Sequence, residues 1–205
     1  RALSQRADAK APDDPRRQYM THCQRCHAAN GDGQGLIQPN LARFPRAFAG
    51  NKAFYRHISD QRIQNSLAEG IPGTPMPPYE GLLAMAERNR LMDLIFQRFI
   101  RIEREDKASF PPLPEAPAQL APSHEIDRLY RQKCARCHGV AGTGTGVEYR
   151  EHLPRPRNLN NSVFMQSISD QRIAGSIVDG VAGTGMPAFR SSLSSQEIWG
   201  MVDRV

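Results

Sequence analysis

The sequence predicts an all-α protein made of two tandem domains of the same kind, and three observations support this. The chain of 205 residues contains one pattern twice, about 110 positions apart. A repeat of about 100 residues is too long for a solenoid and has the size of a whole domain. Apolar residues recur at helical spacing in both halves, and no alternating run of four or more apolar residues indicates a strand.

The repeat can be aligned residue by residue. The offset is 111 positions between Cys23 and Cys134, and it holds through the glycines that follow. One residue is then lost, and the offset is 110 for segments 58–63 and 168–173, which both read Ile-Ser-Asp-Gln-Arg-Ile. The two halves therefore carry the same elements in the same order.

Each half opens with a helix that runs into its cysteines. In the first half, Asp14 is placed as the capping residue and Pro15 as the first helical residue. In the second half, Ser123 follows Pro122 and is expected to cap the helix. A tyrosine stands one turn ahead of each first cysteine: Tyr19 and Tyr130.

A short helix and a final helix follow in each half. A glycine-rich loop comes first and allows the backbone to approach a flat ligand. Ser59 and Ser169 are then expected to cap the short helix, which should end at Gly70 and Gly180. The final helices are predicted from their apolar spacing: Leu91, Leu94, Ile95 and Phe99 in one half, and Ile198, Trp199 and Val202 in the other.

These elements divide the chain into four parts. They are an N-terminal tail (1–13), a first domain (14–104), a Pro-rich linker (105–122) and a second domain (123–205). Five prolines lie in the linker, which is expected to be semi-rigid and extended. The chain starts without methionine and ends partway through a predicted helix, so we expect a mature or truncated chain.

Composition excludes two function classes. No stretch approaches the ~18 uninterrupted apolar residues that a membrane helix needs. The net charge of +6 is uneven, since residues 1–107 hold 17 Lys and Arg against 12 Asp and Glu, and residues 108–205 hold 10 against 9. Neither half has a dense basic run or a basic helix face, so nucleic-acid binding is not predicted.

All four cysteines lie in two Cys-x-x-Cys-His motifs. The motif residues are Cys23, Cys26 and His27, and Cys134, Cys137 and His138. This is the signature of covalent c-type haem attachment. Two thiols about one helical turn apart can each bind a haem vinyl group, and the following imidazole can then face the iron.

Three alternatives compete for the cysteines. Two structural disulfides would explain the even number of cysteines, but not the histidine after each pair. A four-cysteine zinc site needs its pairs closer in sequence, and more than a hundred residues separate them here. A thioredoxin-like pair should follow a strand, whereas both motifs lie in helical patterns.

With these motifs in order, each half resembles a class I cytochrome c domain, over residues 14–104 and 123–205. The resemblance rests on four features in the same order: the Cys-x-x-Cys-His helix, the short helix, a Gly-Thr-x-Met-Pro loop and the final helix. The resemblance implies a dihaem cytochrome c with two covalently attached haem c groups (iron), each wedged between crossing first and last helices. One departure is Ala28 after His27, where the family more often has glycine; Gly139 keeps the family pattern.

The sixth iron ligand is predicted to be a methionine in each half. Among seven methionines, only Met76 and Met186 occupy equivalent positions, each in a loop bounded by glycine and proline. A loop methionine before proline is poorly placed for core packing, and cytochromes c pair Met with His at the iron. The predicted ligands are His27 with Met76 and His138 with Met186. Three other methionines are expected in the core: Met85, Met92 and Met201.

Two arginines are candidates to bind the haem propionates. Arg46 and Arg157 both lie in Pro-Arg-x-apolar segments, and a guanidinium group matches a carboxylate. The alternative is an exposed loop arginine. The remaining histidines have no counterparts in the other half and are expected to be solvated: His22, His57, His124 and His152.

The predicted function is electron transfer rather than catalysis, because an iron held by His and Met has no open position for a substrate. An alternative is a dihaem enzyme of the thiosulfate dehydrogenase or peroxidase type; another is a haem module of a larger oxidoreductase complex. The expected location is the periplasm or the outer face of the bacterial cytoplasmic membrane. The expected partners are redox proteins in transient complexes, with an acidic one steered to the first half by Arg25 and Arg43 or Arg46.

Overall fold

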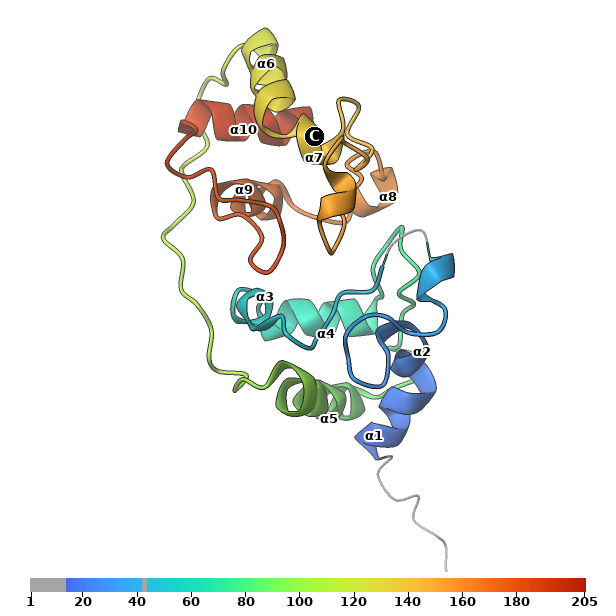
Figure 1. The fold of residues 1–205 in the computed structure, drawn as a ribbon. Helices are drawn as coiled ribbons and strands as arrows, with labels where there is room; N and C mark the ends of the chain where they lie inside the picture. Colours follow the sequence, from blue (N-terminus) through green and yellow to red (C-terminus); the bar gives the residue numbers. More distant parts are fainter. Residues whose placement is uncertain (1–13, 42–43) are drawn as a thin grey trace, which may run out of the picture.

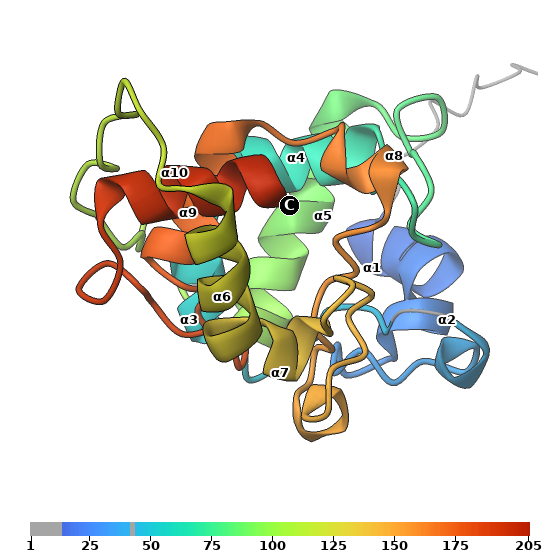
Figure 2. The ribbon, with the colours of Figure 1, turned by 90° about the horizontal axis from the view of Figure 1, so that it is seen from above.

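The computed structural model describes residues 14–41 and 44–205. Throughout these residues the regular structure is helical and no strand occurs. The helices form two groups, one from each half of the chain, and the linker runs along one side between them (Figure 1). The second group overlies the first when the molecule is viewed from above (Figure 2). The predicted all-α tandem fold is confirmed.

The first half contains a first helix with a π-helical turn in its middle, two short helices and a long final helix. The elements are α1 (Pro15–Gln18), η1 (Tyr19–Cys23), α2 (Gln24–His27), η2 (Gln38–Asn40), α3 (Lys52–Arg56), α4 (Asp60–Ala68), α5 (Met85–Ile95) and η3 (Phe96–Ile100). The π-helical turn η1 joins α1 to α2 without a break, and together they form the predicted first helix. The side chain of Asp14 caps it by accepting a hydrogen bond from Arg16 N at 3.0 Å, as predicted.

The second half repeats this order. Its elements are α6 (Ser123–Lys133), α7 (Ala135–His138), η4 (Tyr149–Glu151), α8 (Ser162–Met165), α9 (Asp170–Val178) and α10 (Ser195–Arg204). The predicted serine cap of the first helix is wrong, because Ser123 is already the first helical residue and Pro122 precedes it without a side-chain hydrogen bond. Helix α6 is anchored instead by its buried apolar face, which includes Leu129 and Tyr130.

The short helices α4 and α9 begin and end as predicted. Ser59 Oγ accepts a hydrogen bond from Arg62 N at 3.2 Å, and Ser169 Oγ accepts one from Arg172 N at 3.3 Å. Just beyond the two helices, Gly70 and Gly180 have φ of 74° and 69°. This left-handed conformation is typical of glycine after a helix end.

Packing of the first helix on the last forms each core. Helix α1 packs on α5 in the first half, and α6 packs on α10 in the second. The methionines Met92 and Met201 are buried as expected, at 1% and 2% exposure. Met85 is 68% exposed, so its assignment to the core is wrong. It is the first residue of α5, at the end of the helix that faces solvent.

The linker contains no helix or strand and is hydrogen-bonded to both halves. Lys107 Nζ donates to the carbonyl oxygens of Tyr55 and Ile58, at 3.2 and 3.1 Å. Further along, Arg190 Nη1 donates to the carbonyl of Pro112 at 3.0 Å. Trp199 Nε1 donates to the carbonyl of Pro114, also at 3.0 Å. The linker is therefore held against the domains along much of its length.

Among the residues that the structure describes, none of the helices has the length and apolar character that a membrane-spanning segment requires.

The departure at Ala28 produces backbone strain. Ala28 ends α2 with φ 65° and ψ 164°, and the equivalent Gly139 has φ 80° and ψ 152°. This region of φ and ψ is adopted almost only by glycine, and a residue with a β-carbon is destabilised there by about 1–3 kcal/mol.

We expect Ala28→Gly to stabilise the protein by about 1 kcal/mol, after the greater entropy of glycine in the unfolded chain is deducted. Denaturant unfolding of the holoprotein measures this, and Gly139→Ala should have the opposite effect. An unchanged or lower stability of Ala28→Gly would contradict the strain.

A second prediction concerns the acid stability of the first half. Asp60 accepts a hydrogen bond from Arg104 Nε at 2.8 Å and pairs with Lys107 Nζ at 2.9 Å. Burial raises the pKa of Asp60, but the hydrogen bonds from Lys107 and Arg104 outweigh it and hold the pKa below its ordinary value. The stabilisation is therefore present above the unfolded-state pKa of about 3.9 and is lost as the pH falls through the folded-state pKa.

Asp60→Asn should accordingly reduce the free energy of unfolding at pH 7, and the difference from wild type should shrink as the pH falls below about 4. Asp106→Asn is the control, because Asp106 pairs with Arg56 at an exposed site. A difference between Asp60→Asn and wild type that is independent of pH would show that the carboxylate charge does not contribute.

Candidate haem sites

The two Cys-x-x-Cys-His turns have the same local structure. Cys23 ends η1, and Cys26 and His27 lie in α2; Cys134 and the turn α7 repeat this arrangement. All four cysteines are free thiols, so the disulfide alternative is not realised. Among the described residues, no cluster of metal-ligating side chains combines the two cysteine pairs, which leaves the zinc alternative without support.

A glycine of the following loop lies directly on each turn. Gly35 N donates to the carbonyl of Cys26, and Gly146 N donates to that of Cys137, both at 3.1 Å. A β-carbon at Gly35 or Gly146 would come within 2.2 Å of a carbonyl oxygen of the turn. In the structure Gly35 and Gly146 permit close approach to the backbone of the motif itself. Approach of the glycine-rich loop to a flat ligand stays a prediction.

Each motif histidine is oriented by a hydrogen bond to the backbone. His27 Nδ1–H donates to the carbonyl of Arg46 at 3.1 Å, and His138 Nδ1–H donates to that of Arg157 at 2.9 Å. Nε2 is then the nitrogen that can bind a metal, as is usual for metal-binding histidines. Burial lowers the pKa of His27 to about 4, although its hydrogen bond to Arg46 raises it. The neutral imidazole that an iron ligand requires is therefore the stable form near neutral pH.

The thiols are not activated for redox catalysis. Burial raises the pKa of Cys23 to about 12 and that of Cys134 to about 11. Burial also raises the pKa of Cys137, with a further contribution from Glu148. A reactive thioredoxin-like cysteine has a lowered pKa, so this alternative is disfavoured.

The methionine loops are closed by matching hydrogen bonds. Met76 O accepts from Ile71 N at 3.1 Å, and Thr74 Oγ1 donates to the carbonyl of Ile71 at 2.7 Å while accepting from Met76 N at 3.3 Å. The second loop repeats these contacts. Met186 O accepts from Val181 N at 3.1 Å, and Thr184 Oγ1 donates to the carbonyl of Val181 at 2.7 Å while accepting from Met186 N at 3.1 Å. Both methionines are half-buried and pack on the core of their own half. Each methionine is thus held in a self-bonded turn.

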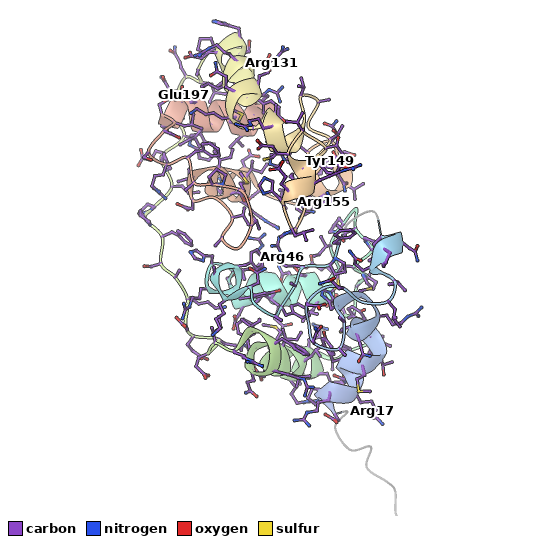
Figure 3. All side chains as sticks on the ribbon, viewed as in Figure 1. Arg17, Arg46, Arg131, Tyr149, Arg155 and Glu197 are labelled. Atoms are coloured by element: carbon purple, nitrogen blue, oxygen red, sulfur yellow. The ribbon has the colours of Figure 1, made fainter. Side chains whose placement is uncertain are left out.

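Arg46 and Arg157 are half-buried and do not behave as exposed loop arginines. Each guanidinium lies over a phenylalanine ring, with Cζ 3.8 Å from the ring centroid of Phe54 or Phe164. Arg46 Nη1 is buried and has no hydrogen-bond partner among the described residues. Arg46 lies where the two halves face each other (Figure 3). A buried donor without an acceptor fits the carboxylate of a haem propionate.

Sequence reasoning missed two further arginines beside this site, Arg62 and Arg172. They are half-buried equivalents in the repeated Ile-Ser-Asp-Gln-Arg-Ile segments, and that identity was the available signal. Burial, with the charges of Arg172 and Arg46, lowers the pKa of Arg62 to about 10. In the described part of the chain, no carboxylate pairs with Arg46, Arg62 or Arg172. The cationic cluster lacks a counter-charge, which haem propionates would supply.

The other predicted surface residues differ in placement. His57 and His124 are exposed, whereas His22 is half-buried with its ring against Tyr79. The expectation for His152 is wrong, because its ring packs on the second methionine loop, where a β-carbon on Gly185 would lie 2.2 Å from His152 Nδ1.

Among the arginines expected to steer a partner, Arg25 is exposed, whereas Arg46 is half-buried. Arg43 lies outside the described residues.

Comparison with known families assigns both halves. Residues 14–97 match the family model for cytochrome c, and residues 121–203 match that for subunit III of cbb3-type cytochrome c oxidase. A comparison with curated proteins gives no match.

One solved structure is similar over nearly the whole chain, and two others match part of it. A chain of the Kuenenia stuttgartiensis reducing HAO-like protein complex Kustc0457/Kustc0458 is similar over 93% of both chains, with a TM-score of 0.64 and 23% identity. The c-type cytochrome NirC matches 44% of this chain over 93% of its own length, with a TM-score of 0.34 and 26% identity. The KustC0563 c-type cytochrome matches 38% of this chain over 89% of its own, with a TM-score of 0.31 and 28% identity.

The family matches fall on the two halves that carry the Cys-x-x-Cys-His turns, and the solved structure similar over nearly the whole chain has the tandem fold. The motif cysteines imply covalent attachment of one haem c in each half. This chain is therefore a dihaem c-type cytochrome built from two tandem cytochrome c domains.

Proposed function

We propose that this cytochrome is an electron carrier, or the electron-transfer subunit of an oxidoreductase, in which each haem iron is held by one His and one Met. The ligand pairs are His27 with Met76 and His138 with Met186. The observation that carries the proposal is the repetition of both ligand environments. Each half has a histidine bonded through Nδ1 and a methionine in a turn closed by the same contacts.

When bound, haem c supplies a one-electron change at an iron that has no open position for a substrate. The chain's part is to keep the ligands in place in both oxidation states. The carbonyls of Arg46 and Arg157 orient the imidazoles, and the closed turns hold the methionine sulfurs. The side chains of Arg46 and Arg157 would bind the propionates, and the buried aromatic residues around them exclude water.

The second candidate is a dihaem enzyme of the thiosulfate dehydrogenase or peroxidase type. Such an enzyme needs one iron with a different or absent sixth ligand. The two methionine loops have matching hydrogen bonds, and no cysteine lies outside the haem motifs. These observations favour electron transfer, and they are compatible with a haem module in a larger oxidoreductase complex.

The proposed domains are residues 14–104 and 123–205, and the proposed location is the periplasm or the outer face of the cytoplasmic membrane. Covalent haem attachment in the resembled family occurs there. The proposed partners are redox proteins that dock transiently beside a haem edge.

Ligation is tested by exchanging each methionine for histidine. Met76→His and Met186→His should each lower the reduction potential of one haem and leave the other nearly unchanged, because axial-ligand identity moves haem potentials over about 0.8 V. Redox titration with the near-infrared sulfur-to-iron band measures both effects. Met92→Leu is the control, since Met92 is a buried core methionine. If either ligand variant kept both potentials and the full band, that methionine would not bind iron.

Docking is tested by the salt dependence of the electron-transfer rate with an acidic partner. Arg25 and Arg136 are equivalent and exposed, but Arg136 is paired with Glu148, and no carboxylate pairs with Arg25 among the described residues. Screening acts over about 8 Å at physiological ionic strength. Arg25→Gln should therefore flatten the salt dependence in stopped-flow measurements more than Arg136→Gln does. Equal slopes for the two variants would show that the first half does not steer the partner.

A further inference from the structure

The two methionine loops meet the opposite half of the molecule through equivalent residues. Asn161 Nδ2, in the second half, donates to the carbonyl of Gly73 in the first methionine loop at 3.0 Å. Gly183, in the second methionine loop, lies against Asn51 of the first half, where a β-carbon would be 1.9 Å from Asn51 Oδ1. The offset of 110 aligns Asn51 with Asn161 and Gly73 with Gly183. The contacts are therefore reciprocal, as across a two-fold axis.

Glycine is required at both contact points. Gly73 and Gly183 have φ of 66° and 68°, which disfavours other residues. A β-carbon at Gly73 would also lie 2.2 Å from Asn161 Nδ2, so the asparagine occupies the space that a side chain would fill. The loops are thus shaped to receive an amide from the other half.

The second methionine loop is packed on the first half at two places. Val181, which begins the loop, packs against the core of the first half. Asn51 is 9% exposed, and its Oδ1 is buried without a hydrogen-bond partner. Asn51 Nδ2 donates to the carbonyl of Ala47 at 3.4 Å within its own half, so Asn51 meets Gly183 by close packing rather than through its amide donor.

The contacts act on the methionines because hydrogen bonds tie each glycine and methionine into one closed turn. Gly73 lies inside the turn that the hydrogen bonds between Ile71, Thr74 and Met76 close. Gly183 has the same place in the turn that ends at Met186. A contact that fixes the position of the glycine therefore also restricts the position of the methionine three residues later.

We propose that Asn161 and Asn51 are positioning residues that act across the domain interface: Asn161 holds Met76 on the first haem, and Asn51 holds Met186 on the second. Each methionine ligand is therefore supported by the domain that does not contain its haem. The proposal rests on the methionine ligation proposed above.

The test measures how easily added imidazole displaces the methionine from each ferric haem. In a Met186→His background the near-infrared sulfur-to-iron band reports Met76 alone, and in a Met76→His background it reports Met186 alone. Into both we place Asn161→Asp. This variant keeps the oxygen that accepts a hydrogen bond from Phe164 N at 3.2 Å and removes the donor to Gly73.

Asn160→Asp is the matched control. It introduces the same charge one residue away, and Asn160 Nδ2 donates at 2.7 Å to Ala141 O within its own half. Haem content and far-ultraviolet circular dichroism establish that each variant is folded and carries both haems.

Loss of one ordinary hydrogen bond changes an equilibrium constant roughly 2- to 12-fold. Asn161→Asp should therefore increase the apparent imidazole affinity of the first haem by that factor and leave the second haem unchanged, and Asn160→Asp should alter neither. Asn51→Ala, which removes the amide packed against Gly183, should affect the second haem alone.

Equal behaviour of Asn161→Asp and Asn160→Asp at the first haem would overturn the proposal. So would an effect of Asn161→Asp confined to the second haem, because the residue would then act within its own half. Absence of the sulfur-to-iron band from the two single-methionine backgrounds and from the wild type would overturn the ligation itself, which separates failure of the proposed function from failure of the cross-domain support.

Discussion

Each domain depends on one hydrogen bond between the motif histidine and the backbone of an arginine nineteen residues later. The bond fixes the imidazole ring and its tautomer, and it ties the Cys-x-x-Cys-His turn to the Pro-Arg segment. The same arginine then places its side chain over a phenylalanine, and Arg46 lies where the two halves face each other (Figure 3). A single backbone position therefore sets both the orientation of the proposed iron ligand and the place of a cation beside the proposed haem site.

The cations are the reason for regarding the domain interface as part of the haem sites. Arg46 and Arg62 lie in the first domain and Arg172 in the second, and burial lowers the pKa of all three. Like charges brought together in a half-buried space repel each other, so without an anion this interface is electrostatically unfavourable. Haem loading would supply the anions, and the association of the domains is then coupled to the cofactor that they carry.

The features that could be predicted from the sequence are those that occur in both halves or that depend on neighbouring residues in the chain. The helices, the haem motifs, the caps at Ser59 and Ser169 and the two methionine loops all follow from periodicity or from the alignment of the halves. The error at Ser123 is local, because this serine is itself the first helical residue. The other errors concern tertiary surroundings. The exposure of Met85 depends on where the helix end lies, and the packing of His152 depends on a glycine more than thirty residues away. Arg62 and Arg172 were overlooked because an arginine on a short helix is usually solvated, and only the fold brings the two near each other.

The linker shows a different kind of constraint. Asp106 and Lys107 bind the first domain through their own side chains. Further along, side chains of the second domain bind the linker, and the acceptors are carbonyl oxygens of Pro111, Pro112, Pro114 and Glu115. A carbonyl is supplied by any amino acid, so the identity of these linker residues is weakly constrained. Their number is not, because adding or removing one residue would shift each carbonyl away from its donor. Over evolution, these four positions should accept substitutions readily, while the segment should resist insertions and deletions, the reverse of what is common for an exposed loop.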